Sequence, residues 1–187
     1  MYAATQPVGD IADRGLASGL ADSTVAAEPL ECINFVIGDD QYGVDIMSVR
    51  EIKVWSNVTH LPKQPDYVRG VLDLRGVVVP IIDLRCRFGQ GPTDCTPTHI
   101  IIIVQLEGRQ MGLLADRVLD IVSVEQSAVQ SVPTVARSSR ARFLAGLVTV
   151  AGAMIALIDL VRLLSDDVDN EIPPNAMRAT PEVLSCA

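Results

Sequence analysis

The stretch Gly70–Leu84 decides the fold, because it occurs twice in the chain. It reads GVLDLRGVVVPIIDL, and seventy-six residues later Gly146–Leu160 reads GLVTVAGAMIALIDL, with both glycines and the Ile-Asp-Leu in register. A second match precedes each copy. Gly43-Val44 with Val49, Glu51 and Ile52 corresponds, at an offset of 69, to Gly112-Leu113 with Val118, Asp120 and Ile121. Two features repeated in one order predict a duplicated fold unit of roughly 55–65 residues.

The two copies differ at a charged position. Arg75 lies between the matching residues of the first copy, whereas Ala151 holds the same place in the second. The repeated unit therefore does not need an arginine at this position to fold. We interpret Arg75 as a functional residue.

Short aliphatic segments separated by glycine predict an all-β chain with short helices. Each unit holds about five strands, which close most economically as a small barrel, since closure removes exposed strand edges. Residues 32–37 and 41–44 form one expected hairpin, and residues 71–74 and 77–82 form another. Apolar residues at three-residue spacing between them, at Ile46, Val49 and Ile52, predict a short amphipathic helix or turn over 46–53. The duplication places its counterpart over 117–124.

Composition excludes several classes of function. The net charge of −8 and a pI near 4.6 argue against nucleic-acid binding, which needs concentrated Lys and Arg. The four cysteines and two histidines show no metal-ligand spacing, so we expect no metal and no cofactor. With only 4% aromatic residues, the core should be aliphatic. The uncharged run 143–158 is too short for a membrane helix and matches a copy that contains charges and proline, so we expect no membrane insertion.

Nothing in the sequence indicates an enzyme. The repeated Asp83 and Asp159 are better explained as caps of the turn or helix that follows each strand than as a catalytic pair. Glu51 and Arg75 remain as a charged pair within one copy. The alternatives are an ordinary exposed salt bridge, worth about 0–1 kcal/mol, and a functional pair.

The residues named so far resemble the CheW family of chemotaxis coupling proteins. The resemblance covers about residues 31–165 and rests on the segments Tyr42–Ile46, Val49–Ile52, Val71–Gly76, Val79–Arg85 and Ile158–Leu160. It implies two intertwined, pseudo-symmetric, five-stranded SH3-like β subdomains. It also implies a cytoplasmic scaffold, recruited to membrane receptor arrays, that links the tips of methyl-accepting chemoreceptors to the regulatory domain of the histidine kinase CheA.

The duplication and the family resemblance together give the expected domain organisation. Residues 1–29 form a disordered leader, residues 30–166 form the CheW-like domain, and residues 167–187 form a flexible tail. Within the domain we expect a first barrel over about 31–90 and a second over about 98–165, with strand exchange between them left open.

The resemblance also implies a receptor-binding site. By position, Glu51 and Arg75 match the family's charged pair beside a receptor groove, and Val49 matches an apolar contact residue. Ile52 joins them through the predicted helix, and the duplication places Val118 and Ile121 on the other wall. No residue is assigned to the kinase contact. Asp73 departs from the family, where Asn is common, and so does the apolar tip Val150–Ala153.

Two other functions stay open at this point. One is a CheW-like adaptor in a pathway with a non-flagellar output such as surface motility. The other is an unrelated β-barrel enzyme, which convergent acidic residues in a cleft would reveal.

Overall fold

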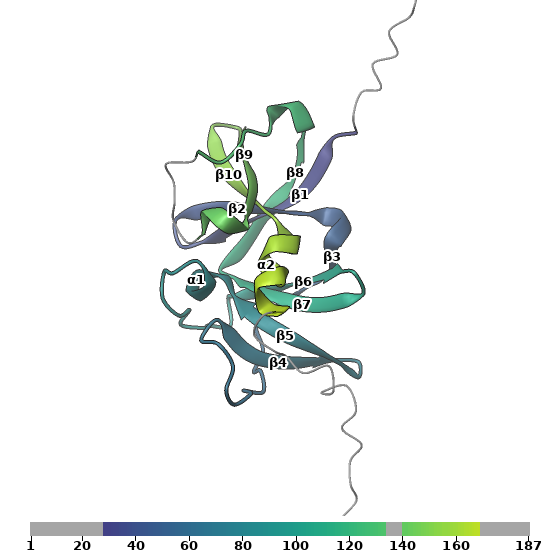
Figure 1. Cartoon of the computed structure of the whole chain (residues 1–187), viewed down its shortest axis with the longest axis vertical. Coiled ribbons are helices and arrows are strands. Elements are labelled where there is room, and N and C mark those ends of the chain that lie inside the picture. Colours follow the sequence, from purple (N-terminus) through teal and green to yellow (C-terminus); the bar gives the residue numbers. More distant parts are fainter. Residues whose placement is uncertain (1–27, 134–139, 169–187) are drawn as a thin grey trace, which may run out of the picture.

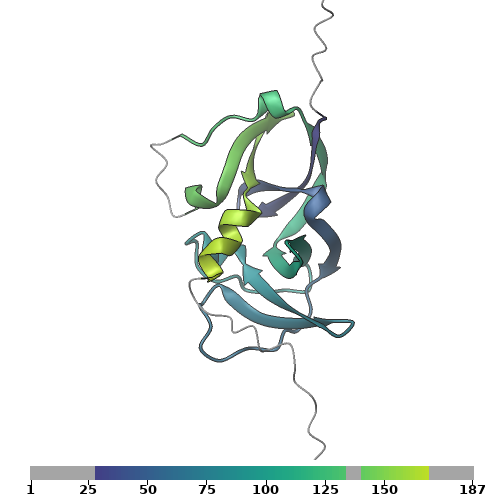
Figure 2. The ribbon, with the colours of Figure 1, turned by 45° about the vertical axis from the view of Figure 1, so that its right-hand side comes forward.

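The structure is a computed structural model, and it describes residues 28–133 and 140–168. Most of the predicted leader and tail therefore lies outside the described residues. The described chain is mostly strand, as predicted, and its ten strands form two five-stranded sheets. Figure 1 shows the two sheets one above the other, with helix α2 (Leu160–Val168) crossing between them, and the turned view of Figure 2 shows the same arrangement.

Each copy contributes the same series of five strands and one helix. The first copy contains β1 (Leu30–Ile37), β2 (Asp40–Asp45), β3 (Val49–Val54), β4 (Val68–Leu74), β5 (Val77–Asp83) and α1 (Leu84–Arg87). The second contains β6 (Ile100–Leu106), β7 (Arg109–Ala115), β8 (Arg117–Val124), β9 (Leu144–Val150), β10 (Ala153–Ile158) and α2.

The sheets do not follow the two halves of the chain. One sheet has the order β8-β1-β2-β10-β9 and the other has the order β3-β6-β7-β5-β4. Replacing each strand by its counterpart in the other copy converts the first order into the second. The first hairpin of each copy (β1–β2 or β6–β7) thus lies in the sheet that contains the last two strands of the other copy. The repeat boundary near residues 90–98 is not a boundary between sheets.

The duplication extends to the pairing register. In the first sheet β10 runs parallel to β2 with Leu157 opposite Gly43, and in the second β5 runs parallel to β7 with Ile81 opposite Gly112. Isolated bridges link the segment after each inner edge strand to the other edge of its sheet: Thr59, after β3, pairs with Val71 on β4, and Gln130, after β8, pairs with Leu147 on β9. We call the two closed sheets barrel A (β8-β1-β2-β10-β9) and barrel B (β3-β6-β7-β5-β4).

Three apolar clusters fill the molecule. Barrel A encloses a small cluster around Cys32, Val122 and Ile155, and barrel B encloses one around Ile81, Ile101 and Ile103. A larger shared core lies where the barrels meet. The few aromatic residues gather in that shared core, where the rings of Phe35, Tyr42, Phe88 and Phe143 stack in succession, with neighbouring centroids 5.2–6.2 Å apart. The shared core therefore combines aliphatic residues with a row of aromatic rings.

The predicted helix or turn over 46–53 is present only in its first three residues, and its counterpart over 117–124 is a strand. Only Ile46–Ser48 forms a single 3-10 turn, η1, and strands β3 and β8 follow in the two copies. Each of these strands carries a β-bulge, which adds one residue between two positions that face the same way. Because of the extra residue, neighbouring side chains on one face of the strand are three residues apart instead of two. A spacing of three residues is also typical of a helix, which explains the wrong prediction.

The aspartates of the two Ile-Asp-Leu segments cap helices, as predicted. Asp83 accepts a hydrogen bond from the backbone N–H of Cys86 in α1, and Asp159 accepts one from Arg162 in α2. Each carboxylate thereby satisfies an N–H group that has no partner inside its helix.

Candidate partner-binding surface

The four apolar residues proposed from the sequence lie on one face of two edge strands. On β3, Val49 lies opposite Val104 and Ile52 lies opposite Ile102, both of which belong to the shared core. Residues directly opposite one another point to the same face of a sheet. Val49 and Ile52 therefore point toward the shared core side, and the bulge between them is what makes this possible.

Strand β8 repeats this arrangement in barrel A. Val118 lies opposite Phe35 and Ile121 lies opposite Ile33, and both of those partners belong to the shared core. The symmetry predicted from the sequence is thus present in the structure.

Within each pair, one residue is packed and the other is exposed. Val49 and Val118 are half-buried against the shared core, whereas Ile52 is 44% exposed and Ile121 is 60% exposed. Large apolar side chains that are exposed beside a packed core mark candidate contact surfaces. We call Val49, Ile52, Val118 and Ile121 the edge-strand residues.

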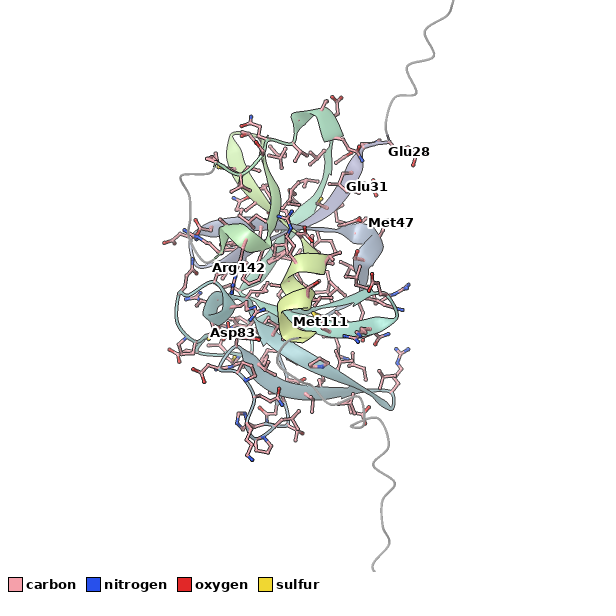
Figure 3. The ribbon with its side chains drawn as sticks, in the orientation of Figure 1. Glu28, Glu31, Met47, Asp83, Met111 and Arg142 are labelled. Atoms are coloured by element: carbon pink, nitrogen blue, oxygen red, sulfur yellow. The ribbon has the colours of Figure 1, made fainter. Side chains whose placement is uncertain are left out.

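Sequence reasoning missed other exposed apolar residues on the same elements. Met47 on η1 is 82% exposed, and Val54 on β3 and Leu119 on β8 are exposed as well. Met47 stands on the opposite side of the view from Asp83 and Arg142 (Figure 3). The sequence pattern did not predict Val54 and Leu119, because neither residue fits the three-residue spacing of Ile46, Val49 and Ile52 or of its counterpart in the second copy.

Glu51 and Arg75 lie on the same barrel but do not pair in the described structure. Glu51 is half-buried opposite Ile103, on the face of β3 that points into barrel B. Arg75 is exposed at the tip of the β4–β5 hairpin. No ion pair joins the two among residues 28–133 and 140–168, so the alternative of a simple salt bridge is not supported.

The hairpin tip holds Arg75 in an unusual backbone conformation. Its φ is +56° and that of Gly76 is +86°, while Ala151 and Gly152 adopt +49° and +84° at the equivalent tip. Such consecutive left-handed residues form the two-residue turn that suits a hairpin, where Asn and Gly are preferred. The Asp73 carboxylate accepts the Gly76 N–H at 2.7 Å and so fixes the turn. Arginine gives the turn no local advantage.

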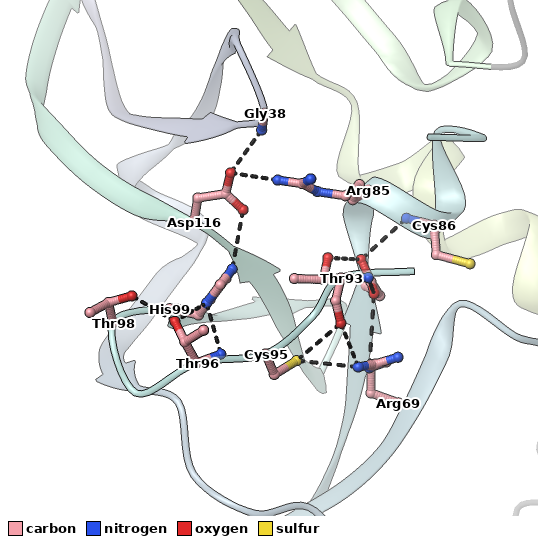
Figure 4. Close-up of polar contacts among 11 residues, drawn as sticks. Gly38, Arg69, Arg85, Cys86, Thr93, Cys95, Thr96, Thr98, His99 and Asp116 are labelled. Carbon is pink, nitrogen blue, oxygen red and sulfur yellow. Dashed lines mark hydrogen bonds and ion pairs between the residues drawn. The ribbon is translucent and has the colours of Figure 1, made fainter. Parts of the chain in front are cut away.

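A polar network that the sequence did not reveal surrounds the segment between the two copies (Figure 4). Asp83 is fully buried and accepts the backbone N–H of Thr93 at 2.8 Å and its hydroxyl at 2.7 Å, with Arg69 Nε at 3.8 Å. Arg69 in turn donates to the Thr93 carbonyl at 2.7 Å and to the Cys95 sulfur at 3.3 Å. This network fastens the segment between the copies onto barrel B.

A second carboxylate links the barrels. Asp116 joins β7 of barrel B to β8 of barrel A and accepts the backbone N–H of Gly38 and a guanidinium N–H of Arg85, both at 2.8 Å. Its other oxygen lies 3.5 Å from Nε2 of His99. Because the Thr96 N–H donates to Nδ1 of His99, the ring proton belongs on Nε2, toward Asp116. These contacts are structural.

The titrating groups add no sign of catalysis. Burial, with a smaller contribution from Asp45, raises the pKa of the Cys32 thiol to about 11, which disfavours a reactive thiolate. Burial likewise raises the pKa of Tyr42. Among the described residues, no three His, Cys, Asp or Glu side chains are placed to hold a metal ion. Within the same residues, none of the helices has the length and apolarity that a membrane crossing requires.

Comparison with known families agrees with this geometry. The CheW-like domain matches residues 31–168, which is almost the whole described part of the chain. The chain belongs to the CheW-like family.

Individual relatives support the assignment. The chain is 43% identical over 136 residues to a probable chemotaxis protein CheW of Rhizobium etli, a match that covers 73% of this chain and 88% of the relative. It is 36% identical over 150 residues to the chemotaxis protein CheW of Klebsiella aerogenes, covering 80% and 89%. This CheW-like chain has the adaptor role in chemotaxis signalling that defines the family.

A solved structure confirms the architecture. The crystal structure of the scaffolding protein TtCheW from Thermoanaerobacter tengcongensis matches with a TM-score of 0.65 and 30% sequence identity, covering 71% of this chain and 85% of that one. The prediction of two five-stranded SH3-like β subdomains is therefore confirmed.

Proposed function

We propose that this CheW-like chain connects the cytoplasmic tips of methyl-accepting chemoreceptors to the histidine kinase CheA, and that it does so by binding rather than by catalysis. The edge-strand residues form the receptor contact in this proposal. A receptor tip is a helical hairpin, so one of its apolar stripes is expected to lie on an apolar surface of the adaptor.

One observation carries the assignment of the site. The duplication gives both barrels the same bulged edge strand, and the two bulges turn Val49 with Ile52 and Val118 with Ile121 toward the shared core side. The outer member of each pair remains exposed. Exposed apolar residues beside a packed core provide a surface that a partner helix can cover.

In this proposal Arg75 acts as an exposed charge at the β4–β5 hairpin tip of barrel B, and Glu51, whose side of β3 points into barrel B, is retained from the family resemblance alone. Charges at the rim of an interface set orientation and partner choice more than affinity. Arg75 suits this role because its turn would accept asparagine or glycine more readily and because Ala151 fills its equivalent. Asp73 caps the turn with a carboxylate, which adds a negative charge next to Arg75 and thereby changes the field that a receptor meets.

A reconstitution tests the adaptor role. Receptor in nanodiscs, purified CheA and the full chain are combined, and kinase autophosphorylation is followed with and without attractant. We expect kinase activity to rise when the chain is added and to fall again with attractant. Equal activity with and without the chain would contradict the proposal.

A further inference from the structure

The outer end of β3 continues the apolar face of the proposed receptor contact. Val54 follows Ile52 on the same face of the strand, lies opposite Ile100 and is 65% exposed. Ile100 is half-buried and packs against the shared core. The contact surface therefore ends in an apolar pair on the barrel B side.

The equivalent end of β8 is polar. Ser123 is the counterpart of Val54 at the offset of 69, and it lies opposite Glu31 where β3 has an isoleucine. No bulge separates Ser123 from Ile121, so Ser123 and Glu31 point to the same face as Ile121. Both are exposed, and in the described part of the chain no ion pair involves Glu31. In Figure 3 Glu31 lies on the same side of the view as Met47, the residue of η1 that stands two places before β3 begins.

The duplication makes the rest of this surface nearly symmetric. Val49 and Val118 are packed against the shared core, and Ile52 and Ile121 are the more exposed residues farther along each strand. The relation between the copies exchanges β3 with β8 and is restored when it is repeated, so it acts as a two-fold rotation. A helix that lay across a fully symmetric surface would make equal contacts in two opposite directions. Only the outer ends distinguish the two directions.

We propose that Val54 and Glu31 fix the direction in which the partner helix lies on this surface. This inference rests on the proposed receptor contact. The β3 end takes an apolar turn of the helix, and the β8 end takes a turn that carries lysine or arginine, because the Glu31 carboxylate attracts a cation. In the reverse direction the basic group would lie over Val54 and an apolar turn over Glu31, so both ends would be mismatched.

The charge at the β8 end is tested by calorimetry with the full chain and the cytoplasmic fragment of a chemoreceptor from the same cell. We expect Glu31→Lys to weaken binding by about fivefold at low salt and by less at high salt, because exposed charges are screened. Asp39→Lys is the matched control, since Asp39 is an exposed carboxylate in the β1–β2 turn and the change in net charge is the same. Equal affinities of the two variants would overturn the role of Glu31.

The apolar end is tested in the same assay. We expect Val54→Ser to weaken binding by about threefold to fivefold, because the contact loses apolar area. Val161→Ser on α2 is the control, since Val161 is also about half exposed and should leave the affinity unchanged. Thermal unfolding of both variants shows whether they are folded. An unchanged affinity of folded Val54→Ser would overturn the role of Val54.

Photo-cross-linking measures the direction itself. A photoreactive side chain is placed at Ser56, just after β3, or at Glu125, its exposed counterpart just after β8, and mass spectrometry identifies the receptor residues that it captures. We expect the two positions to capture different turns of the receptor helix. In the variant that combines Val54→Ser, Ser123→Val and Glu31→Lys, each position should capture both turns. Capture of the same receptor residues from both positions in the wild type would overturn the proposal.

The outcomes distinguish this inference from the proposed function. If Ile121→Asp abolishes binding while Glu31→Lys and Val54→Ser leave affinity and cross-links unchanged, the assignment of direction is wrong and the receptor contact stands. If Ile121→Asp has no effect, the receptor contact is wrong and the assignment of direction is wrong with it.

Discussion

The inward-facing residues of β1 in barrel A and of β6 in barrel B show how the two copies have diverged. At equivalent positions barrel B has Ile101 and Ile103, whereas barrel A has Cys32 and Asn34. Strand register is the same in both. On this strand barrel B is therefore the more apolar copy, and barrel A has a thiol and an amide beside its edge strand β8. We therefore expect equivalent substitutions to cost more stability in barrel B than in barrel A.

The largest difference in unfolding free energy between equivalent variants of the two copies is expected at the two capping aspartates. Asp83→Ala removes a fully buried carboxylate and leaves the Thr93 donors without their acceptor, which should cost about 3–5 kcal/mol of unfolding free energy. Asp159→Ala removes a partly exposed cap and should cost about 1 kcal/mol. Urea unfolding followed by circular dichroism and by Trp55 fluorescence measures both. Similar losses of unfolding free energy for Asp83→Ala and Asp159→Ala would show that the two caps contribute equally to stability.

Glycines on the parallel strands give a direct comparison of packing. A Cβ on Gly112 would lie 2.5 Å from Ile81 Cδ1 and 2.6 Å from Ile101 Cγ2, while one on Gly43 would lie 2.9 Å from Leu157 Cδ2 and 3.2 Å from Ile155 Cγ2. Gly112→Ala should therefore cost about 1–3 kcal/mol and Gly43→Ala less. Thermal unfolding of both variants checks the order. The reverse order would mean that barrel A is the tighter copy.

The cysteine inside barrel A should make stability depend on pH. The pKa of Cys32 is about 11 in the folded chain against an ordinary 9.0, so the folded state favours the protonated thiol. This contribution is complete below pH 9 and is lost as pH rises toward 11. The unfolding free energy of the wild type should fall more over that range than that of Cys32→Ala, because all other groups are shared. Parallel pH profiles would contradict this.

The smallest effect on stability is expected at the hairpin tip. Arg75→Ala should change unfolding free energy by less than about 0.5 kcal/mol, because Ala151 already adopts the same backbone conformation. The same variant should weaken the coupling of receptor state to kinase activity in the reconstituted system. A large loss of stability, or normal coupling, would contradict the interpretation of Arg75 as a functional residue.

The sequence predicted the parts of this molecule that repeat. Matching offsets of 69 and 76 identified the strands, the hairpin turns at Gly76 and Gly152 and the capping aspartates, because each leaves a local pattern. It failed at β3 and β8, where a bulge imitates helical spacing. It also did not predict the hydrogen bonds between Thr93 and Asp83 and between Asn34 and Asp120, because only the fold brings these residues together.

The proposed receptor contact depends most on the edge-strand residues. Val118 is half-buried against the shared core, so a charge there would test folding as well as binding. Ile121 is the cleaner position, and Val161 on α2, which is 52% exposed, provides a matched control. The affinity of Ile121→Asp and Val161→Asp for a receptor cytoplasmic fragment is the direct measurement. We predict a loss of at least about tenfold for Ile121→Asp and none for Val161→Asp, with both variants folded, and equal affinities would contradict the account.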